Sequence, residues 1–220
     1  ISQKIIPSKF ITGNLKGNLE DIDNVKTISK DHMTDSYRKY IDVQIAKSIS
    51  RTIYLNPAKR LLMSRDRLIQ MAKNVSINWK IKTNEIISIG SRDIRELDNI
   101  QSLFKKSKVV GIDLFSASDR IISADMHNIP LDDESFDISI SIHCQEHSYD
   151  PSKSLGEIFR LTRNGGLICI EVPVNFKLSA TDRVDYKNLE GLVSYFPDNS
   201  VEVIQSELEN RSPRPTNLRI

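Results

Sequence analysis

Residues 111–166 read GIDLFSASDRIISADMHNIPLDDESFDISISIHCQEHSYDPSKSLGEIFRLTRNGG, and this stretch decides the fold. Two short apolar runs lead up to acidic residues in it. Val109–Ile112 stops at Asp113, and Ile121–Ala124 stops at Asp125. Apolar runs of this length, flanked by polar segments, are typical of buried parallel strands. The pattern therefore predicts two such strands, each with a carboxylate at its carboxyl end.

The second half of the stretch alternates strand and helix signals. Phe136–Ile142 alternates apolar and small polar residues, as a strand does. Asp150-Pro151 then opens a helical run, Asn164-Gly165-Gly166 ends it, and Leu167–Ile170 begins another strand. This order indicates βαβ units, so the sequence predicts an α/β fold with parallel strands.

The ordered set of motifs resembles class I S-adenosylmethionine-dependent methyltransferases of the methyltransferase type 11 kind. In that family, a strand that ends in an acid precedes an Asp-containing loop with Ile-Pro or Leu-Pro. An FD strand, a Glu-His pair, a DP helix start and a GG turn follow. The corresponding segments here are Asp113, DMHNIP at 125–130, FDISISI at 136–142, EH at 146–147, DP at 150–151 and NGG at 164–166. The resemblance covers Glu85 to Pro173 and implies S-adenosylmethionine as cofactor and methyl transfer as activity.

The resemblance also implies a Rossmann-like, seven-stranded, mostly parallel sheet with helices on both faces and an N-terminal helical cap. We expect the methyltransferase domain over residues 81–220 and the N-terminal segment with the cap over residues 1–80. Within 1–80, apolar stripes predict helices from Thr34 or Asp35 to about Ser50 and from Asn56 to about Asn74. By analogy with the family these helices cover the cofactor; the alternative is packing on one sheet face.

The end of the chain supplies the remaining elements. Leu189–Phe196 predicts a helix that Pro197 stops. Ser200–Leu208 alternates as a strand does, and Asn217–Ile220 predicts the last strand. In the family the final strand runs antiparallel beside the sixth. Between Asp113 and Asp125 the family usually has a helix, but the residues here suffice only for a turn.

The first strand ends in a turn that departs from the family pattern of an acid followed by alternate glycines. Gly90 keeps the first glycine, whereas Ser88 stands at the acid and Arg92 and Ile94 stand at the next two glycines. The departure indicates either a subgroup with a differently built loop or a domain that has lost cofactor affinity. The resemblance implies that Gly90, Ser91 and Arg92 contact the cofactor, with a surface ion pair as the alternative for Arg92.

Two strand ends supply the other expected cofactor contacts. By resemblance, Asp113 accepts the ribose hydroxyls, with Leu114 beside it. Asp125 accepts the adenine amino group next to the backbone of Met126, or else it caps its own loop. His127 is expected to point to solvent or to cap the loop.

The segment after the fourth strand offers candidates for chemistry. Methyl transfer to oxygen or nitrogen is an in-line displacement, and a base must remove the proton of the acceptor. His143 is the candidate catalytic base, with contact to the cofactor edge or a structural role as alternatives. Glu146 and His147 match the family's Glu-His pair, in which the His anchors the loop. Their spacing is not that of an HExxH zinc helix, so no metal site is expected.

Charge and composition constrain the partners. Residues 1–80 hold 15 Lys and Arg against 7 Asp and Glu, and residues 81–220 hold 16 against 22. The basic part either faces an anionic substrate or forms solvated helix faces. It has no aromatic stacking platform, so nucleic acid is not favoured. No apolar run approaches the ~20 residues of a membrane helix.

Two cysteines, Cys144 and Cys169, form neither a disulfide framework nor a zinc pattern. They indicate reduced thiols and a cytoplasmic protein. The sequence therefore predicts a methyltransferase with a small-molecule or glycan-type acceptor. The alternative is a non-catalytic methyltransferase-like binding module with a degenerate cofactor loop. The sequence leaves the oligomeric state open.

Overall fold

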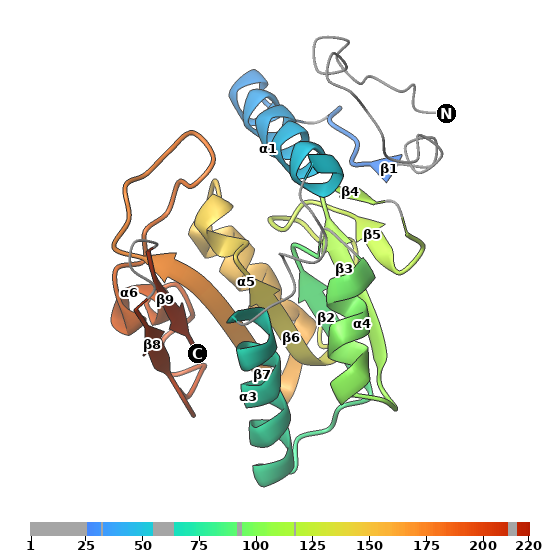
Figure 1. Cartoon of the computed structure of the whole chain (residues 1–220), viewed down its shortest axis with the longest axis vertical. Helices are drawn as coiled ribbons and strands as arrows, with labels where there is room; N and C mark the ends of the chain where they lie inside the picture. Colours follow the sequence, from blue (N-terminus) through green and yellow to red (C-terminus); the bar gives the residue numbers. More distant parts are fainter. Residues whose placement is uncertain (1–25, 32, 55–63, 92–93, 117, 211–214) are drawn as a thin grey trace.

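The computed structural model describes residues 26–31, 33–54, 64–91, 94–116, 118–210 and 215–220. At its centre is a seven-stranded sheet in the order β5-β3-β2-β6-β7-β9-β8 (Figure 1). The first five strands in this order are parallel, and β9 pairs antiparallel with both β7 and β8. The strands are β2 (Glu85–Ile89), β3 (Lys108–Asp113), β5 (Ile121–Ser123), β6 (Phe136–Ile142), β7 (Thr162–Val174), β8 (Glu207–Glu209) and β9 (Thr216–Arg219). The predicted seven-stranded, Rossmann-like sheet is confirmed.

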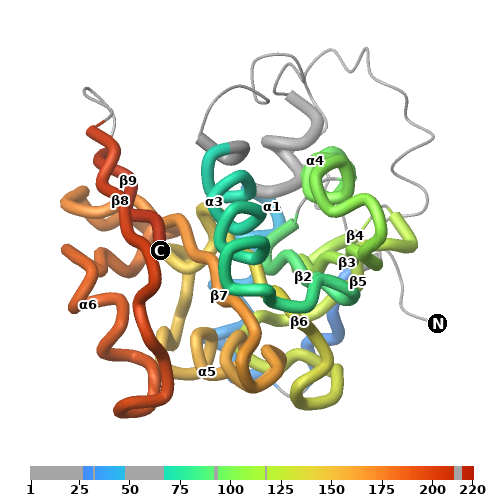
Figure 2. The backbone as a smooth tube through the Cα atoms, turned by 90° about the horizontal axis from the view of Figure 1, so that it is seen from below, coloured from blue at the N-terminus to red at the C-terminus, as the bar shows by residue number. Residues whose placement is uncertain are grey.

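Helices cover both faces of this sheet (Figure 2). On one face, α3 (Ser64–Asn78) and α4 (Ile94–Leu103) pack in a cluster that includes Ile86. On the other face, α5 (Pro151–Leu161) and α6 (Leu189–Val193) pack in a cluster that includes Ile87 and Ile89. Successive side chains of a strand point to opposite faces, so β2 is buried on both sides. Its nearly continuous apolar sequence follows from that position.

The sequence predicted correctly where the two helices in the second half of the chain begin. The side chain of Asp150 accepts a hydrogen bond from the backbone N–H of Lys153, which caps α5. Asn188 caps α6 in the same way through Gly191. However, α6 ends at Val193, three residues before the predicted end at Phe196. Pro197 disfavours the helical conformation for the residue before it, so the last residues form a turn instead.

The C-terminal edge contains less strand than predicted. Only Glu207–Glu209 pairs as a strand, whereas residues 200–206 have no ladder partner among the described residues. Val201 and Ile204 in this segment pack on the two core clusters. The alternating pattern therefore reflects side-chain packing of an extended segment and not sheet pairing. β9, at Thr216–Arg219, matches the predicted last strand and its antiparallel direction.

The two N-terminal helices occupy different positions. α1 (Asp35–Tyr54) starts where predicted and runs four residues beyond Ser50; in Figure 1 it lies above β5. α3 ends at Asn78 and not at Asn74, and its predicted start at Asn56 lies outside the described residues. α3 packs on the sheet face through Leu68 and Ile69, which are buried. The domain boundary at residue 80 stays a prediction.

The connection between Asp113 and Asp125 contains no helix in its described residues, as the sequence predicts. Instead, β4 (Phe115–Ser116) pairs antiparallel with β1 (Lys26–Thr27), a small ladder that the sequence analysis missed. Among the described residues, no helix combines the length and apolar character that a membrane crossing needs.

Candidate functional site

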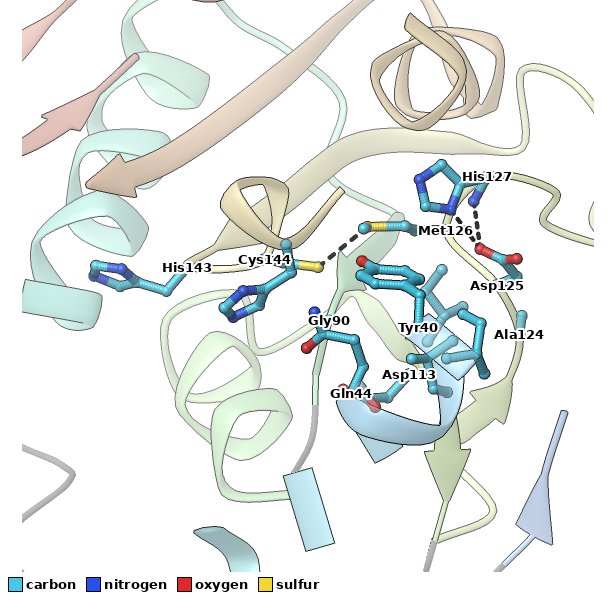
Figure 3. A pocket seen from close by; sticks show the side chains of 14 residues that line it. Tyr40, Gln44, Gly90, Asp113, Ala124, Asp125, Met126, His127, His143 and Cys144 are labelled. Carbon is cyan, nitrogen blue, oxygen red and sulfur yellow. Dashed lines mark hydrogen bonds and ion pairs between the residues drawn. The ribbon is translucent and has the colours of Figure 1, made fainter. Parts of the chain in front are cut away.

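A cavity of about 60 Å³ lies where β2, β3, β5 and β6 end and where α1 crosses above them (Figure 3). Six of the sequence-predicted residues line it together: Gly90, Asp113, Leu114, Asp125, Met126 and His143. Tyr40, Ile41 and Gln44 of α1 line it from above. Parallel sheets bind ligands outside the carboxyl ends of their strands, and the cavity has this position.

Gly90 forms the turn at the end of β2. Its φ of +84° is accessible to glycine and is strained for other residues. A Cβ atom at this position would lie 2.5 Å from Sγ of Cys144 and 2.6 Å from its Cβ. The amides of Gly90 and Ser91 both donate to the carbonyl of Ile112, at 2.9 and 3.0 Å, which ties the turn to β3. The backbone conformation at position 90 and the lack of space around it therefore both require glycine, which is the first glycine of the family pattern.

Ser91 belongs to this turn, but its side chain points away from the cavity. The hydroxyls of Ser88 and Ser91 both donate to Oε1 of Glu96, at 2.7 and 2.9 Å. Both serines are fully buried, and Glu96 is 8% exposed. Ile94 packs on the cluster beneath α4. Arg92, the third predicted contact of this turn, lies outside the described residues.

Asp113 ends β3 opposite Ser123 of β5, and its side chain lines the cavity. Its carbonyl accepts a hydrogen bond from the amide of Ala124 at 2.9 Å, so the two strand ends are joined. Leu114 also lines the cavity and packs against the buried Tyr40 and Ile41 of α1. A carboxylate at this edge can accept hydrogen bonds from paired hydroxyl groups.

Asp125 is held by two side chains. Oδ2 accepts from the hydroxyl of Tyr37 at 2.7 Å, and Oδ1 lies 2.7 Å from Nδ1 of His127. Nε2 of His127 accepts from the amides of Tyr149 and Asp150, so the ring proton resides on Nδ1 and is donated to Asp125. Burial alone would raise the pKa of Asp125, but these hydrogen bonds outweigh it and lower the pKa.

The expectation that His127 points to solvent is therefore wrong, whereas the alternative of loop capping agrees with its contacts. Its side chain is 7% exposed and joins the loop of Asp125 to the segment that begins α5. The His is buried because the amides of residues 149 and 150 need an acceptor there. Capping of the loop and contact with adenine remain compatible for Asp125, since each carboxylate oxygen has two lone pairs.

His143 adopts a left-handed conformation with a φ of +50°. Its Nε2 lies 2.9 Å from Oε1 of Glu171, and its Nδ1 lies 3.5 Å from Oε1 of Glu146. Burial alone would lower the pKa of His143, but the two carboxylates raise it to about 9. The ring is thus an imidazolium at neutral pH, and in Figure 3 it points away from Met126. An imidazolium has no lone pair to accept a proton, so this geometry favours the structural role.

Glu171 is fixed from the other side as well. Its carboxylate is fully buried and pairs with Arg219, and Nδ2 of Asn217 donates to it at 3.0 Å. Burial alone would lower the pKa of Arg219, but its hydrogen bonds and charges from Glu209 and Glu171 raise it. β7 and β9 are thereby joined by a buried ion pair that the sequence analysis missed.

His147 pairs with a residue that the sequence analysis did not consider. Its Nδ1 lies 2.9 Å from the carbonyl oxygen of Thr181 and 3.0 Å from Oδ1 of Asp182. A carbonyl can only accept, so Nδ1 carries a proton and donates it, whereas Nε2 lies 4.0 Å from Oε1 of Glu146. The hydrogen bond from His147 is the main cause that lowers the pKa of Asp182, with Lys47 adding to it. His147 also lines the cavity.

The segment around Thr181 is bonded to α1. Nε2 of Gln44 donates to the carbonyl of Thr181 at 2.9 Å, and Nζ of Lys47 donates to its hydroxyl at 2.5 Å. The guanidinium of Arg183 stacks over the ring of Tyr40 at 5.3 Å. These contacts hold α1 over the strand ends. Among the described residues, no group of His, Cys, Asp and Glu side chains is arranged to hold a metal ion.

Comparison with known proteins agrees with this architecture. A methyltransferase domain family matches residues 90–170. A Burkholderia thailandensis 1,6-didemethyltoxoflavin N1-methyltransferase, solved with 1,6-didemethyltoxoflavin and S-adenosylhomocysteine bound, has a TM-score of 0.58 at 12% identity. The match covers 89% of this chain and 92% of that one. An Aquifex aeolicus SAM-dependent methyltransferase matches with a TM-score of 0.49 and 12% identity, over 72% of this chain and 98% of that one.

No curated protein sequence matches the chain significantly. The family match spans the turn at Gly90 and the strand ends at Asp113 and Asp125, which line the cavity, and it extends to Ile170 in β7. Residues 90–170 thus belong to a methyltransferase domain, and the sheet around them has the Rossmann-like fold of S-adenosylmethionine-dependent methyltransferases.

Proposed function

We propose that this chain transfers the methyl group of S-adenosylmethionine to a small-molecule or glycan-type acceptor at the cavity beneath α1. The observation that carries the proposal is the convergence of Gly90, Asp113 and Asp125 at the ends of three neighbouring strands. These residues suit three parts of the cofactor. Gly90 lets the backbone approach the methionine part, Asp113 suits the ribose hydroxyls, and Asp125 with Met126 suits the adenine.

We infer that α1 or the ring of Tyr40 shifts when the cofactor binds, because a cavity of about 60 Å³ is far smaller than the roughly 300–1,000 Å³ of ordinary small-molecule sites. The ring of Tyr40 lies in the middle of the labelled side chains in Figure 3. A shift of α1, or a new rotamer of Tyr40, frees the space above Gly90 and Asp113.

The contacts between α1 and the segment at Thr181, which together cover the site, support a small acceptor. Gln44 and Lys47 of α1 bond to the segment at Thr181, so access is restricted to molecules that fit beneath this cover. The Burkholderia thailandensis enzyme, which shares the fold, was solved with a small molecule, 1,6-didemethyltoxoflavin, bound.

The residues at the cavity supply a proton acceptor for the reaction. Bound S-adenosylmethionine supplies an electrophilic methyl group on a sulfonium. We infer that Nε2 of His147 accepts the proton of the attacking hydroxyl or amine, because Nδ1 already donates to Thr181 and Asp182. Asp182 holds the ring in this tautomer and stabilises the imidazolium that forms. His143 instead holds Glu146 and Glu171 together.

Calorimetric titration with S-adenosylhomocysteine and S-adenosylmethionine tests the cofactor site directly. Micromolar binding to the native chain, lost in Asp113→Ala, supports the proposal. Turnover is then tested by following S-adenosylhomocysteine production against a panel of hydroxylated and amine-bearing small molecules and sugars. Binding without turnover of any acceptor class favours the alternative of a non-catalytic binding module. No binding by the folded chain overturns the proposed site.

The predicted cytoplasmic setting is a separate part of the proposal. Neither Cys144 nor Cys169 forms a disulfide, and burial raises the pKa of the Cys169 thiol to about 12. A thiol that stays protonated at neutral pH resists oxidation. Cell fractionation with an antibody to the chain tests the location.

A further inference from the structure

The carboxylate of Glu96 contacts both ends of the turn that carries Gly90. Ser88, the residue two before Gly90, and Ser91, the residue after it, each donate a hydroxyl hydrogen bond to Oε1. Gly90 itself lines the cavity, and the serines on either side of it are fully buried. The carboxylate is therefore attached to the back of the wall that Gly90 presents to the ligand.

Burying a carboxylate costs free energy unless hydrogen bonds and nearby positive charge compensate for it. Glu96 is 8% exposed and lies in the first turn of α4, where the partial positive charge of the helix N-terminus favours an anion. The two serine hydroxyls donate hydrogen bonds to its carboxyl group and hold that group next to the turn.

Ser88 is the position at which the sequence lacks the expected acid. The side chain of Ser88 is short and directed to Glu96, at 2.7 Å, so a carboxylate from α4 reaches the place that a longer acidic side chain at position 88 would otherwise fill. An acid at both positions would bring two like charges within hydrogen-bonding distance, which is unfavourable. Serine at position 88 and glutamate at position 96 are thus mutually consistent.

We propose that Glu96 is a positioning residue that supplies, from α4, the negative charge that the end of β2 lacks, and that this charge favours binding of the α-ammonium group of the cofactor. The inference rests on the proposed cofactor site. The methionine part of S-adenosylmethionine carries one primary ammonium group. A buried carboxylate next to Gly90 attracts this group more strongly than an exposed carboxylate would, because the protein interior screens charges less than water does. The acid that the family has at position 88 is then not lost but supplied by Glu96.

Calorimetry with two ligands distinguishes an effect of the charge of Glu96 from an effect of its hydrogen bonds on the turn. The probes are S-adenosylhomocysteine and its analogue in which hydrogen replaces the α-ammonium group. Glu96→Gln keeps the size of the side chain and its hydrogen-bond acceptor. We expect this variant to bind S-adenosylhomocysteine at least about tenfold more weakly and the analogue within about twofold of the native chain. Glu202→Gln, an exposed position, is the matched control and leaves both affinities unchanged.

A charge-relocation variant provides the second arm. Ser88→Asp combined with Glu96→Gln returns a carboxylate to the turn from the strand, and it restores S-adenosylhomocysteine affinity to within about threefold of native. Ser88→Asp alone, with both acids present, binds more weakly than this double variant. Thermal melts of every variant identify those that fold. If Glu96→Gln does not fold, the preference of the double variant for the ammonium-bearing ligand over the analogue decides the matter.

The outcomes are distinguishable. Equal weakening of both ligands in Glu96→Gln shows that Glu96 only braces the turn, and unchanged binding shows that it has no part; either result overturns the inference alone. A double variant that folds but does not prefer the ammonium-bearing ligand overturns it as well. Failure of the native chain to bind S-adenosylhomocysteine overturns the proposed cofactor site and this inference together.

Discussion

The hydroxyl of Tyr37 donates a hydrogen bond to Oδ2 of Asp125 at 2.7 Å, although the two residues lie 88 positions apart in the chain. Tyr37 belongs to α1 and Asp125 follows β5, so this bond attaches the covering helix to the loop beneath it. Burial is the largest cause that raises the pKa of Tyr37, followed by the bond to Asp125. The tyrosine therefore stays protonated and remains a donor at every physiological pH.

Tyr37→Phe removes this donor and keeps the ring. A hydrogen bond to a charged acceptor contributes about 1.5–3 kcal/mol, and we expect the free energy of unfolding to fall by about 1–2 kcal/mol. Urea denaturation at neutral pH measures the change. Tyr149→Phe is the matched control, because Tyr149 is 44% exposed. A loss in Tyr37→Phe no larger than in the control would show that the bond does not hold α1 in place.

Asp113→Asn tests the proposed ribose contact. Asparagine has nearly the same shape, but its amide group replaces one of the two acceptor oxygens with a donor. We expect the affinity for S-adenosylhomocysteine to fall at least about tenfold, with the melting temperature nearly unchanged. Asp132→Asn, on an exposed turn, is the control and leaves binding as it is. Native-like affinity in Asp113→Asn would show that the cofactor does not bind at the end of β3.

Gly90→Ala introduces a Cβ where the structure has neither the conformation nor the space for it. The left-handed backbone costs an alanine about 1–2 kcal/mol, and the new atom lies 2.5 Å from Sγ of Cys144. We expect loss of stability by roughly 2 kcal/mol or more and loss of cofactor affinity. Cys144→Ala will not rescue the variant, since Cβ of Cys144 is itself only 2.6 Å away. Thermal melts and calorimetry of the single and double variants measure this, and full rescue would contradict the geometry.

His147→Gln tests the proposed proton acceptor. Glutamine retains a donor for the carbonyl of Thr181, so the loop stays anchored while the basic nitrogen is lost. We expect kcat to fall about 10²-fold, with S-adenosylhomocysteine affinity within threefold. His143→Gln is the comparison variant: if it lowers kcat more than His147→Gln does, the base has been assigned to the wrong histidine.

The sequence predicted those parts of the fold and the site that depend on short segments. Apolar runs that end at Asp113 and Asp125, and a glycine at position 90, mark strand ends and a turn because local periodicity and backbone freedom determine them. All three residues line the cavity. The unpaired segment at residues 200–206 shows the limit of this logic, since an alternating pattern records burial on one side and not the presence of a partner strand.

The contacts that the sequence did not predict join distant segments. Asp182 follows His147 by 35 positions in an irregular stretch, and Arg219 meets Glu171 across a strand pair that only the folded sheet creates. Glu96 meets Ser88 only because α4 turns back over β2. No spacing rule relates such pairs, so a sequence can supply the candidates but not their pairing. The proposed exchange of roles between His143 and His147 rests on these pairings.

The pairing of His143 with two carboxylates makes the free energy of unfolding depend on pH. The pKa of His143 is raised from 6.5 to about 9 in the folded chain. A raised pKa means that the folded state binds the proton more tightly than the unfolded state. The stabilisation is therefore fully present below pH 6.5 and is lost as the pH rises through 9. The groups that face the ring are Glu146, Glu171 and Asn217, with Arg219 behind Glu171.

We expect the free energy of unfolding of the native chain to fall by about 2–3 kcal/mol between pH 6.5 and 10 from this group alone. His143→Asn removes the titration while tolerating the left-handed backbone, since asparagine accepts a positive φ more readily than most residues. The variant should be less stable than the native chain at pH 6.5, and the two stabilities should converge near pH 10, where the native imidazole is neutral as well. Urea denaturation at half-unit pH steps measures both curves. Parallel curves, with the same difference at pH 6.5 and pH 10, would mean that His143 is not held as an imidazolium between Glu146 and Glu171.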